Sequence, residues 1–156
     1  MKVRGFTLLE VLVVIIVISL FFSMLFGAYF FVVNKSLKTM KNSKRLYGYA
    51  NALYGMKKAI ECAKTIKIDN SKRFSKVYLY TYCGMYRGFS KEVFFVKDNI
   101  LYVYAYPYAF GDIFFYDPKL AIKLIPVEKF RAKFTVNNFI NLHINNNSFN
   151  IPTLIK

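Results

Sequence analysis

The chain begins with a short basic segment, which is followed at once by a long apolar stretch. Residues 1–5 contain Lys2 and Arg4, and the next 28 residues are interrupted only by Thr7, Glu10, Ser19, Ser23 and Gly27. About 20 apolar residues are enough to cross the hydrocarbon core of a bilayer. The pattern therefore predicts a leader over residues 1–5 and a transmembrane helix over residues 6–33.

Helical periodicity continues after the apolar stretch, without a proline. Apolar residues recur at spacings of three and four at Leu46, Ala50, Leu53, Met56, Ile60, Ala63 and Ile66. This predicts an amphipathic second half over residues 34–67, so that one helix runs from about Phe6 to about Ile66. Such a helix would be about 90 Å long at 1.5 Å per residue. The alternative is a separate helix joined by a hinge near Asn34.

From Lys76 onward the pattern changes to short runs rich in Tyr, Phe, Val and Ile, bounded by Gly, Pro, Asn and Asp, which is typical of strands. Strands are predicted over 77–83, 92–97, 100–106, 113–116, 121–125, 129–136, 140–144 and 149–151. Tight turns are expected at residues 98–99 and 145–147, because Asp and Asn suit them. Residues 68–156 thus form a β-rich globular domain, and the fold class is α+β: a long N-terminal helix packed on a mostly antiparallel sheet.

A motif stands at the junction of leader and apolar helix. It reads Gly5, Phe6, Thr7, Leu8, Leu9, Glu10. In a secretory signal peptide the apolar core precedes the cleavage site and is discarded. Here the only plausible cut, after Gly5, would leave the apolar helix on the mature protein.

These residues resemble the processing motif of the type IV pilin and pseudopilin family, and the strand pattern is most like that of minor pilins and of J-type or W-type minor pseudopilins. The resemblance implies that a prepilin peptidase cleaves between Gly5 and Phe6 and methylates the new amino group of Phe6, and that Glu10 serves filament assembly. The implied partners are other pilin subunits, the peptidase and an assembly platform in the inner membrane.

Glu10 is the one carboxylate in the apolar segment. An ionised carboxylate well inside a bilayer costs about 2.5 to 3.5 kcal/mol on insertion scales, so it indicates a function. Residues 11–34 carry no charge. A partner must therefore come from outside the segment, and the free amine of Phe6 on a neighbouring subunit would suit. The alternative is a solvated Glu10 at the level of the headgroups.

Two features of the sequence predict opposite orientations of the chain in the membrane. Lys35, Lys38, Lys41, Lys44 and Arg45 follow the apolar run, so counting basic residues places the C-terminal part in the cytoplasm. The resemblance implies the opposite: a single-pass protein of the inner membrane whose C-terminal domain lies on the outer, periplasmic face before assembly into a filament. Large domains translocate largely regardless of charge, so we favour the second orientation.

Cys62 and Cys83 are the only cysteines. Their even number and the oxidising compartment implied by the resemblance favour a disulfide between the end of the helix and the first strand. The alternative is a pair of buried free thiols. Two cysteines and one distant histidine make no metal site.

Charge raises a second functional hypothesis. All but two of the 23 basic residues and all but one of the eight acidic residues lie beyond Asn34, which leaves a net charge of +14 there. Basic residues mixed with aromatic ones favour single-stranded nucleic acid. Candidate DNA contacts are Lys44, Arg45, Tyr47, Tyr86, Arg87 and Phe89. The alternative is a composition biased toward Lys, Asn, Ile, Tyr and Phe.

No catalytic constellation or cofactor motif is present, so an enzyme is not expected. His143, the sole histidine, lies in a strand-like run, and the acidic residues are scattered singly. Asp112 and Asp117 could share a loop cation, but an isolated pair falls short of the six to eight oxygens that Ca²⁺ takes. No metal or cofactor is predicted.

The sequence therefore predicts a minor pilin-like (pseudopilin) structural subunit of a type IV pilus or a type II secretion filament. One alternative is a DNA-binding competence pilin that takes part in DNA uptake. Another is an ordinary single-span membrane protein whose motif is coincidental.

Overall fold

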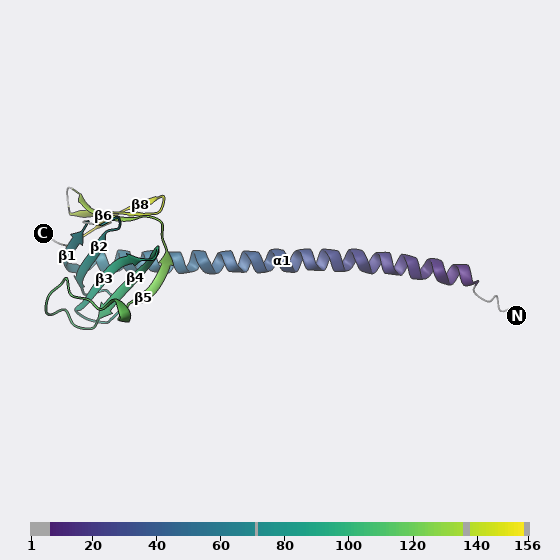
Figure 1. Ribbon diagram of the computed structural model, residues 1–156, viewed down its shortest axis with the longest axis horizontal. Coiled ribbons are helices and arrows are strands. Elements are labelled where there is room, and N and C mark those ends of the chain that lie inside the picture. Colours follow the sequence, from purple (N-terminus) through teal and green to yellow (C-terminus); the bar gives the residue numbers. More distant parts are fainter. Residues whose placement is uncertain (1–6, 71, 136–137, 155–156) are drawn as a thin grey trace. The chain divides into compact units, whose positions relative to one another are not determined.

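The computed structural model describes residues 7–70, 72–135 and 138–154 (Figure 1). Its elements are α1 (Leu8–Glu61), β1 (Ala63–Asp69), β2 (Lys76–Thr81), β3 (Ser90–Lys97), β4 (Ile100–Tyr106), the short 3-10 helix η1 (Pro118–Leu120), β5 (Ile122–Pro126), β6 (Phe130–Thr135), β7 (Phe139–Ile144) and β8 (Asn147–Pro152). The chain divides into two compact units, Met1–Arg45 and Leu46–Lys156, and α1 contributes to both. The predicted α+β class is confirmed.

The helix α1 is continuous from Leu8 through Asn34 to Glu61. The predicted single helix is therefore confirmed over this range, and no break separates a second helix at Asn34. Gly27, the glycine of the apolar stretch, also lies within the regular helix.

The predicted end of the helix near Ile66 is wrong, because residues from Ala63 onward form β1. A register shift in the pairing of β1 with β2 lies between Ala63 and Thr65. The extra residue lets Ala63 and Ile66, three apart, both face the core with 1% and 5% of their surface exposed. A bulged strand thus reproduces the spacing of a helix, which explains the error.

The strands form two antiparallel sheets, where the sequence suggested one. The larger has the order β1-β2-β3-β4-β5 and the smaller the order β6-β7-β8. The predicted turn at Asp98 and Asn99 is confirmed, with φ of 51° and 56°, and Asn145 has φ of 54° in the turn between β7 and β8. Both turns use the left-handed conformation that Asn and Asp tolerate.

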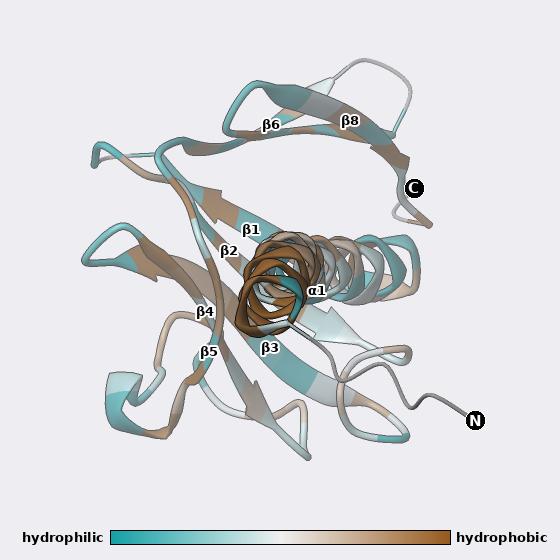
Figure 2. Ribbon diagram, turned by 90° about the vertical axis from the view of Figure 1, so that its right-hand side faces the viewer, coloured by the Kyte–Doolittle hydropathy of each residue, from teal (hydrophilic) through white to brown (hydrophobic). Residues whose placement is uncertain are grey.

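The core of the second unit lies between the C-terminal part of α1 and the two sheets (Figure 2). Ala52, Met56, Ala59 and Ile60 form one buried face of the helix at spacings of three and four. The larger sheet contributes Val77, Leu79, Phe94, Leu101, Val103 and Ile125, and the smaller contributes Phe130, Ala132, Ile140, Leu142, Ile144 and Ile151. The sheets thus both pack on the helix through their apolar faces.

The other face of the larger sheet carries a second apolar cluster, formed by Tyr78, Val93, Phe95 and Tyr104. The strand predicted over residues 113–116 is wrong, because these residues form no strand, and Ile113 and Tyr116 instead pack against this cluster. In this segment the backbone N–H of Phe114 donates to the Asp112 carboxylate at 3.0 Å. A side-chain turn therefore replaces strand pairing, while the aromatic residues still cover apolar surface.

Candidate functional site

The side chains in the apolar part of α1 are exposed in the single chain. None of the residues in its most apolar stretch is buried, and the helix is long and apolar enough to cross a membrane. Phe21, Phe26 and Phe30 are about 60% exposed (61%, 58% and 60%). In Figure 2 the first turns of α1 are coloured as strongly hydrophobic. A surface of this kind needs lipid or other apolar helices around it.

Glu10 closes a capping box at the start of α1. The backbone N–H of Thr7 donates to Glu10 Oε2 at 3.2 Å, and the N–H of Glu10 donates to Thr7 Oγ1 at 3.4 Å. The Thr7 hydroxyl also donates to Glu10 Oε2 at 3.3 Å. The sequence Thr-Leu-Leu-Glu is therefore a helix start signal as well as part of the motif. Sequence reasoning missed this role, although the Thr-x-x-Glu spacing signals it.

The predicted cleavage site, Gly5 and Phe6, lies outside the described residues. Its cleavage and the methylation of Phe6 stay predictions. The same holds for the pairing of Glu10 with an amine of another chain, since the structure contains one chain.

Cys62 and Cys83 are joined in the structure, with sulfur atoms 2.03 Å apart and Cα atoms 5.5 Å apart. Cys62 follows the last residue of α1, as expected. Cys83 does not lie in the predicted first strand, because the strand ends at Thr81 and Cys83 belongs to the following loop. The bond ties the end of the helix to the loop between β2 and β3.

A buried carboxylate anchors the same loop. Glu92, on β3, is 1% exposed, and its Oε1 accepts a hydrogen bond from the backbone N–H of Met85. A Cβ at Gly84 would overlap this oxygen, so the loop passes too close for a side chain there. Burial raises the pKa of Glu92, and the Met85 hydrogen bond lowers it by a smaller amount.

Lys91, also on β3, holds the loop of residues 107–117, which follows β4 and is rich in aromatic side chains. Lys91 is 4% exposed, and its ammonium donates to the backbone carbonyls of Asp112 and Phe115. Burial lowers the pKa of Lys91, which the nearby Asp112 carboxylate partly offsets. The hydroxyl of Tyr80 adds a hydrogen bond of 2.7 Å to the carbonyl of Gly111. Two buried charged side chains of one strand thus position two loops.

The residues proposed for DNA contact do not all belong to one structural element. Lys44 and Arg45 belong to the N-terminal unit, and Tyr47 is 71% exposed on α1 in the second unit. The others lie in the loop between β2 and β3. There Tyr86 and Arg87 are exposed, but Phe89 is half-buried.

Phe89 already has partners within the domain. It stacks on Tyr82 with ring centroids 4.6 Å apart, and Lys64 Nζ lies 5.7 Å from its ring centre. It would have to leave these contacts to stack on a base, so the geometry gives the loop candidate no support. Nucleic-acid contact at these residues stays a prediction.

Asp112 and Asp117, the pair considered for a loop cation, both stabilise turns. Asp112 accepts from the backbone N–H of Phe114, and Asp117 caps η1 by accepting from the N–H of Lys119 at 2.9 Å. Within residues 7–70, 72–135 and 138–154, no group of three or more His, Cys, Asp or Glu could hold a metal.

A further cluster was not singled out in the sequence. Lys129, Arg131 and Lys133, together with His143, Asn145 and Asn146, line an open groove of about 670 Å³ on the smaller sheet. The signal was present, because basic residues alternate with Phe130 and Ala132 over the predicted strand. What the sequence alone did not show is that His143 and the asparagines join them.

Two comparisons with known proteins identify the chain in part. Residues 1–26 match the family model described as the prokaryotic N-terminal methylation motif. A protein of Aquifex aeolicus (strain VF5), described as an uncharacterized protein, is 33% identical over 130 residues, which are 83% of this chain and 73% of the relative. No solved structure matches. The chain therefore carries a type IV pilin-like signal and belongs to the same family as this Aquifex aeolicus protein.

Proposed function

We propose that the protein is a minor pilin-like, or pseudopilin-like, structural subunit of a type IV pilus or a type II secretion filament. The observation that carries the proposal is the apolar part of α1, which begins within the methylation motif and whose most apolar stretch contains no buried residue. Before assembly the helix spans the inner membrane, with the β-rich domain on the outer face. During assembly the same surface packs against the helices of neighbouring subunits.

The dimensions of the helix suit both environments. Residues 8–33 of α1 span about 39 Å at 1.5 Å per residue, against about 30 Å for the hydrocarbon core of a bilayer. Lipid tails and apolar helices both cover such a surface without buried charge. In this proposal a prepilin peptidase removes residues 1–5 and methylates Phe6, and the assembly platform transfers the subunit from the membrane to the filament.

Glu10 has two roles in this proposal, a local one and one between subunits. Both hydrogen bonds from Thr7 reach the same oxygen, Oε2. A carboxylate has about four lone-pair sites, so the capping box leaves capacity for a further donor. The new amine of Phe6 on a neighbouring subunit supplies that donor and neutralises the charge in the apolar surroundings.

Substitutions at Glu10 and Thr7 separate these two roles. Glu10→Gln keeps a side chain that suits the capping box but removes the charge. We expect this variant to insert into the membrane normally and to lose at least about tenfold in recovery from sheared filaments or pilin complexes. It leaves the amine of Phe6 as an unpaired charge in apolar surroundings, and this penalty exceeds the about 1.4 kcal/mol that corresponds to a tenfold change.

Thr7→Ala is the matched control. It removes the hydroxyl of the capping box and keeps the carboxylate, so assembly should stay within about twofold of wild type. If Glu10→Gln assembled as wild type and Thr7→Ala did not, the role of Glu10 would be capping alone, and the proposed ion pair would be wrong.

Processing gives an independent test. In cells with an active prepilin peptidase, intact-mass measurement should show a chain that starts at N-methylated Phe6. Replacement of Gly5 by a bulky residue should leave the precursor uncut. A mature chain that still begins at Met1 in the native host would contradict the proposal.

A DNA-binding subunit of a competence pilus is the second candidate function. It is supported by the net charge of +14 beyond Asn34 and by the basic groove on the smaller sheet. Tight binding of DNA at physiological salt would favour it, whereas general basicity gives a Kd on the order of 10⁻⁴ to 10⁻⁶ M.

A further inference from the structure

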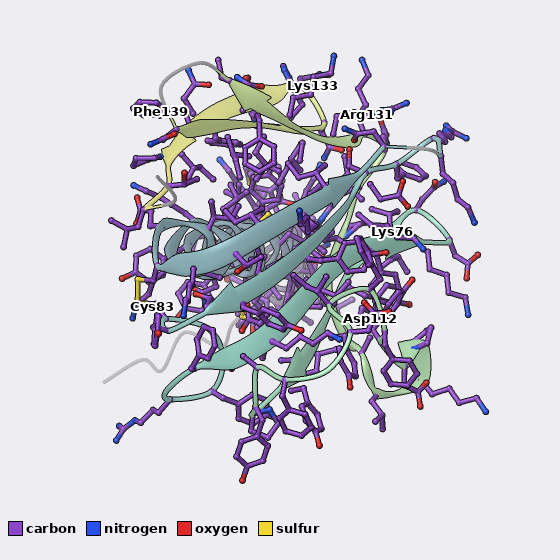
Figure 3. All side chains as sticks on the ribbon, turned by 90° about the vertical axis from the view of Figure 1, so that its left-hand side faces the viewer. Lys76, Cys83, Asp112, Arg131, Lys133 and Phe139 are labelled. Carbon is purple, nitrogen blue, oxygen red and sulfur yellow. A yellow bond between two sulfur atoms is a disulfide. The ribbon has the colours of Figure 1, made fainter. Side chains whose placement is uncertain are left out.

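Three basic side chains form a row that begins just before β6 and continues along it. Lys129, Arg131 and Lys133 alternate with Phe130 and Ala132, which are fully buried in the core. Because successive side chains of a strand point to opposite faces, the three cations share the face that looks away from α1. Figure 3 shows the labelled Arg131 and Lys133 along this face.

The neighbouring strands complete a polar surface around the row. Register places His143 beside Arg131 and Asn141 beside Lys133. The Asn141 amide donates to Ser148 Oγ at 3.1 Å and to Asn150 Oδ1 at 2.6 Å, on β8. We call the surface of Lys129, Arg131, Lys133, Asn141, His143, Ser148 and Asn150 the basic face. It contains no carboxylate, although a β-sheet surface commonly pairs opposite charges across strands.

The cations of the basic face are not paired elsewhere. Among the described residues the one ion pair is Lys57–Glu61, at 3.7 Å. Some other lysines of the domain have partners: Lys91 is held by two carbonyls, and Lys76 Nζ lies 5.3 Å from the ring centre of Tyr116. A lysine-rich composition explains many lysines, but not an acid-free row in which an arginine stands between two of them.

We propose that the basic face binds the phosphodiester backbone of a nucleic acid. The row from Lys129 to Lys133 covers about 14 Å at about 3.4 Å per residue, so its three cations can contact neighbouring phosphates of one strand. The guanidinium of Arg131 suits bidentate contact with a phosphate. The Asn145 and Asn146 side chains line the same groove and supply neutral polar groups.

An aromatic ring ends the row. Phe139 pairs in register with Thr135 and so belongs to the same face, where it is 39% exposed (Figure 3). A base on the strand beyond Lys133 could stack on it, and such stacking adds affinity without reading sequence. The occupant inferred is therefore a single strand bound mainly through phosphates, with little sequence preference.

The test compares two triple variants of the full chain, held in nanodiscs of phosphatidylcholine. The first is Lys129→Gln, Arg131→Gln, Lys133→Gln. The control is Lys67→Gln, Lys97→Gln, Lys123→Gln, which removes three exposed lysines from the larger sheet. Both lose the same charge, so a difference between them reports position and not net charge. Fluorescence anisotropy with a labelled single-stranded oligonucleotide gives Kd between about 50 and 200 mM salt.

Each phosphate contact on a single strand contributes about −0.7 to the slope of log affinity against log salt. We expect the basic-face variant to lose about 2 from this slope and about 30-fold in affinity near 200 mM salt. The control should stay within about twofold. Equal losses in both variants, or no loss in either, would overturn the proposal.

Two further measurements keep the result interpretable. Near-ultraviolet circular dichroism checks the fold, and if the triple variant is unfolded, Lys133→Gln alone should lose about 0.7 from the slope, while an unchanged slope would contradict the proposal. Vesicles of phosphatidylglycerol replace the oligonucleotide in a second titration. Binding to these vesicles that depends on the three residues, without binding of the oligonucleotide, would show that the face takes lipid headgroups and not nucleic acid.

The inference deepens the second candidate function, DNA binding, and is independent of the assembly role. Glu10 variants leave the basic face unchanged, and the basic-face variants leave the motif and apolar helix unchanged. Failure of either experiment therefore says nothing against the other proposal.

Discussion

The two units of the chain differ in the exposure of their large apolar side chains. In the N-terminal unit, large side chains such as Ile16 and Phe21 lie on a single helix, 48% and 61% exposed. In the second unit, side chains such as Met56 and Phe130 are at most 1% exposed, between the helix and two sheets. Both regions contain large apolar side chains, but only the second contains the elements that cover its own surface.

The difference separates stability from assembly. Burial of a large apolar side chain stabilises a fold by about 1.5 to 3 kcal/mol, and in the second unit this gain is realised within one chain. In the apolar helix it is realised only when lipid or other subunits cover the surface. A residue of the same type should therefore affect unfolding in one unit and partner contacts in the other.

The largest expected effect comes from one substitution made in both units. Phe130→Ala should lower the free energy of unfolding of the domain by about 3 to 5 kcal/mol, because it leaves a cavity in the core. Phe21→Ala should leave domain stability within about 0.5 kcal/mol. Urea unfolding of the full chain in detergent, followed by tyrosine fluorescence, measures both, since every tyrosine except Tyr29 lies in the second unit.

If Phe21→Ala destabilised the domain as much as Phe130→Ala, the expected difference between the two units would be wrong. That result would mean that the apolar helix and the domain unfold as one cooperative unit.

The next effect concerns the covalent link between the end of α1 and the loop after β2. The bond between Cys62 and Cys83 spans 21 residues of sequence. Its removal in the variant Cys62→Ser, Cys83→Ser should cost about 3 kcal/mol of domain stability in the chain-entropy description. Reductant should lower the stability of the wild type by a similar amount and leave the variant unchanged.

A peptide map of protein from the native host, alkylated before digestion, should contain one linked pair. Two alkylated thiols there would contradict the pairing, whatever the stability of the variant.

The smallest effect is a pH dependence that belongs to the second unit alone. Burial raises the pKa of Glu92 in the folded protein above its ordinary value of 4.5. The folded state then binds this proton more tightly than the unfolded state, so the free energy of unfolding falls as pH rises from 4.5 through the raised pKa. Above that pKa the contribution is constant.

Glu92→Gln removes this slope and keeps an amide oxygen that can accept from Met85 N–H. We expect the difference in urea midpoint between wild type and variant to change across this pH range and to stay constant above it. A difference that did not vary with pH would show that Glu92 titrates alike in the folded and unfolded chains.

Local patterns predicted those features that local physics controls. The apolar run and the helical periodicity that follows it without a proline predicted one helix through Asn34, and the Asp98-Asn99 pair predicted a turn, in which both residues have positive φ. Most strands were located because alternation and turn residues act over a few positions. In the candidate site, the motif around Glu10 was recognisable for the same reason, although its capping role was overlooked.

The wrong predictions concern segments whose structure depends on contacts with residues far away in the sequence. The residues next to Ala63 do not indicate the bulge that gives this strand a helix-like spacing of buried residues. The bulge depends on the pairing of β1 with β2. Residues 113–116 have strand composition, yet they cover the outer face of the larger sheet, held there by Lys91 from β3. Composition reports that these side chains are apolar, but not which surface they cover.

The sequence by itself determined the N-terminal methylation motif, the long helix and the basic character of the chain, because each depends on neighbouring residues or on composition. Tertiary structure decided that the strands divide into two sheets around α1, and that Glu92 and Lys91 are buried where they hold loops. It also joined His143 and Asn141 to the cations of β6. Strand register brings together residues that are far apart along the chain, and the pairing energy that fixes the register is not contained in any one segment.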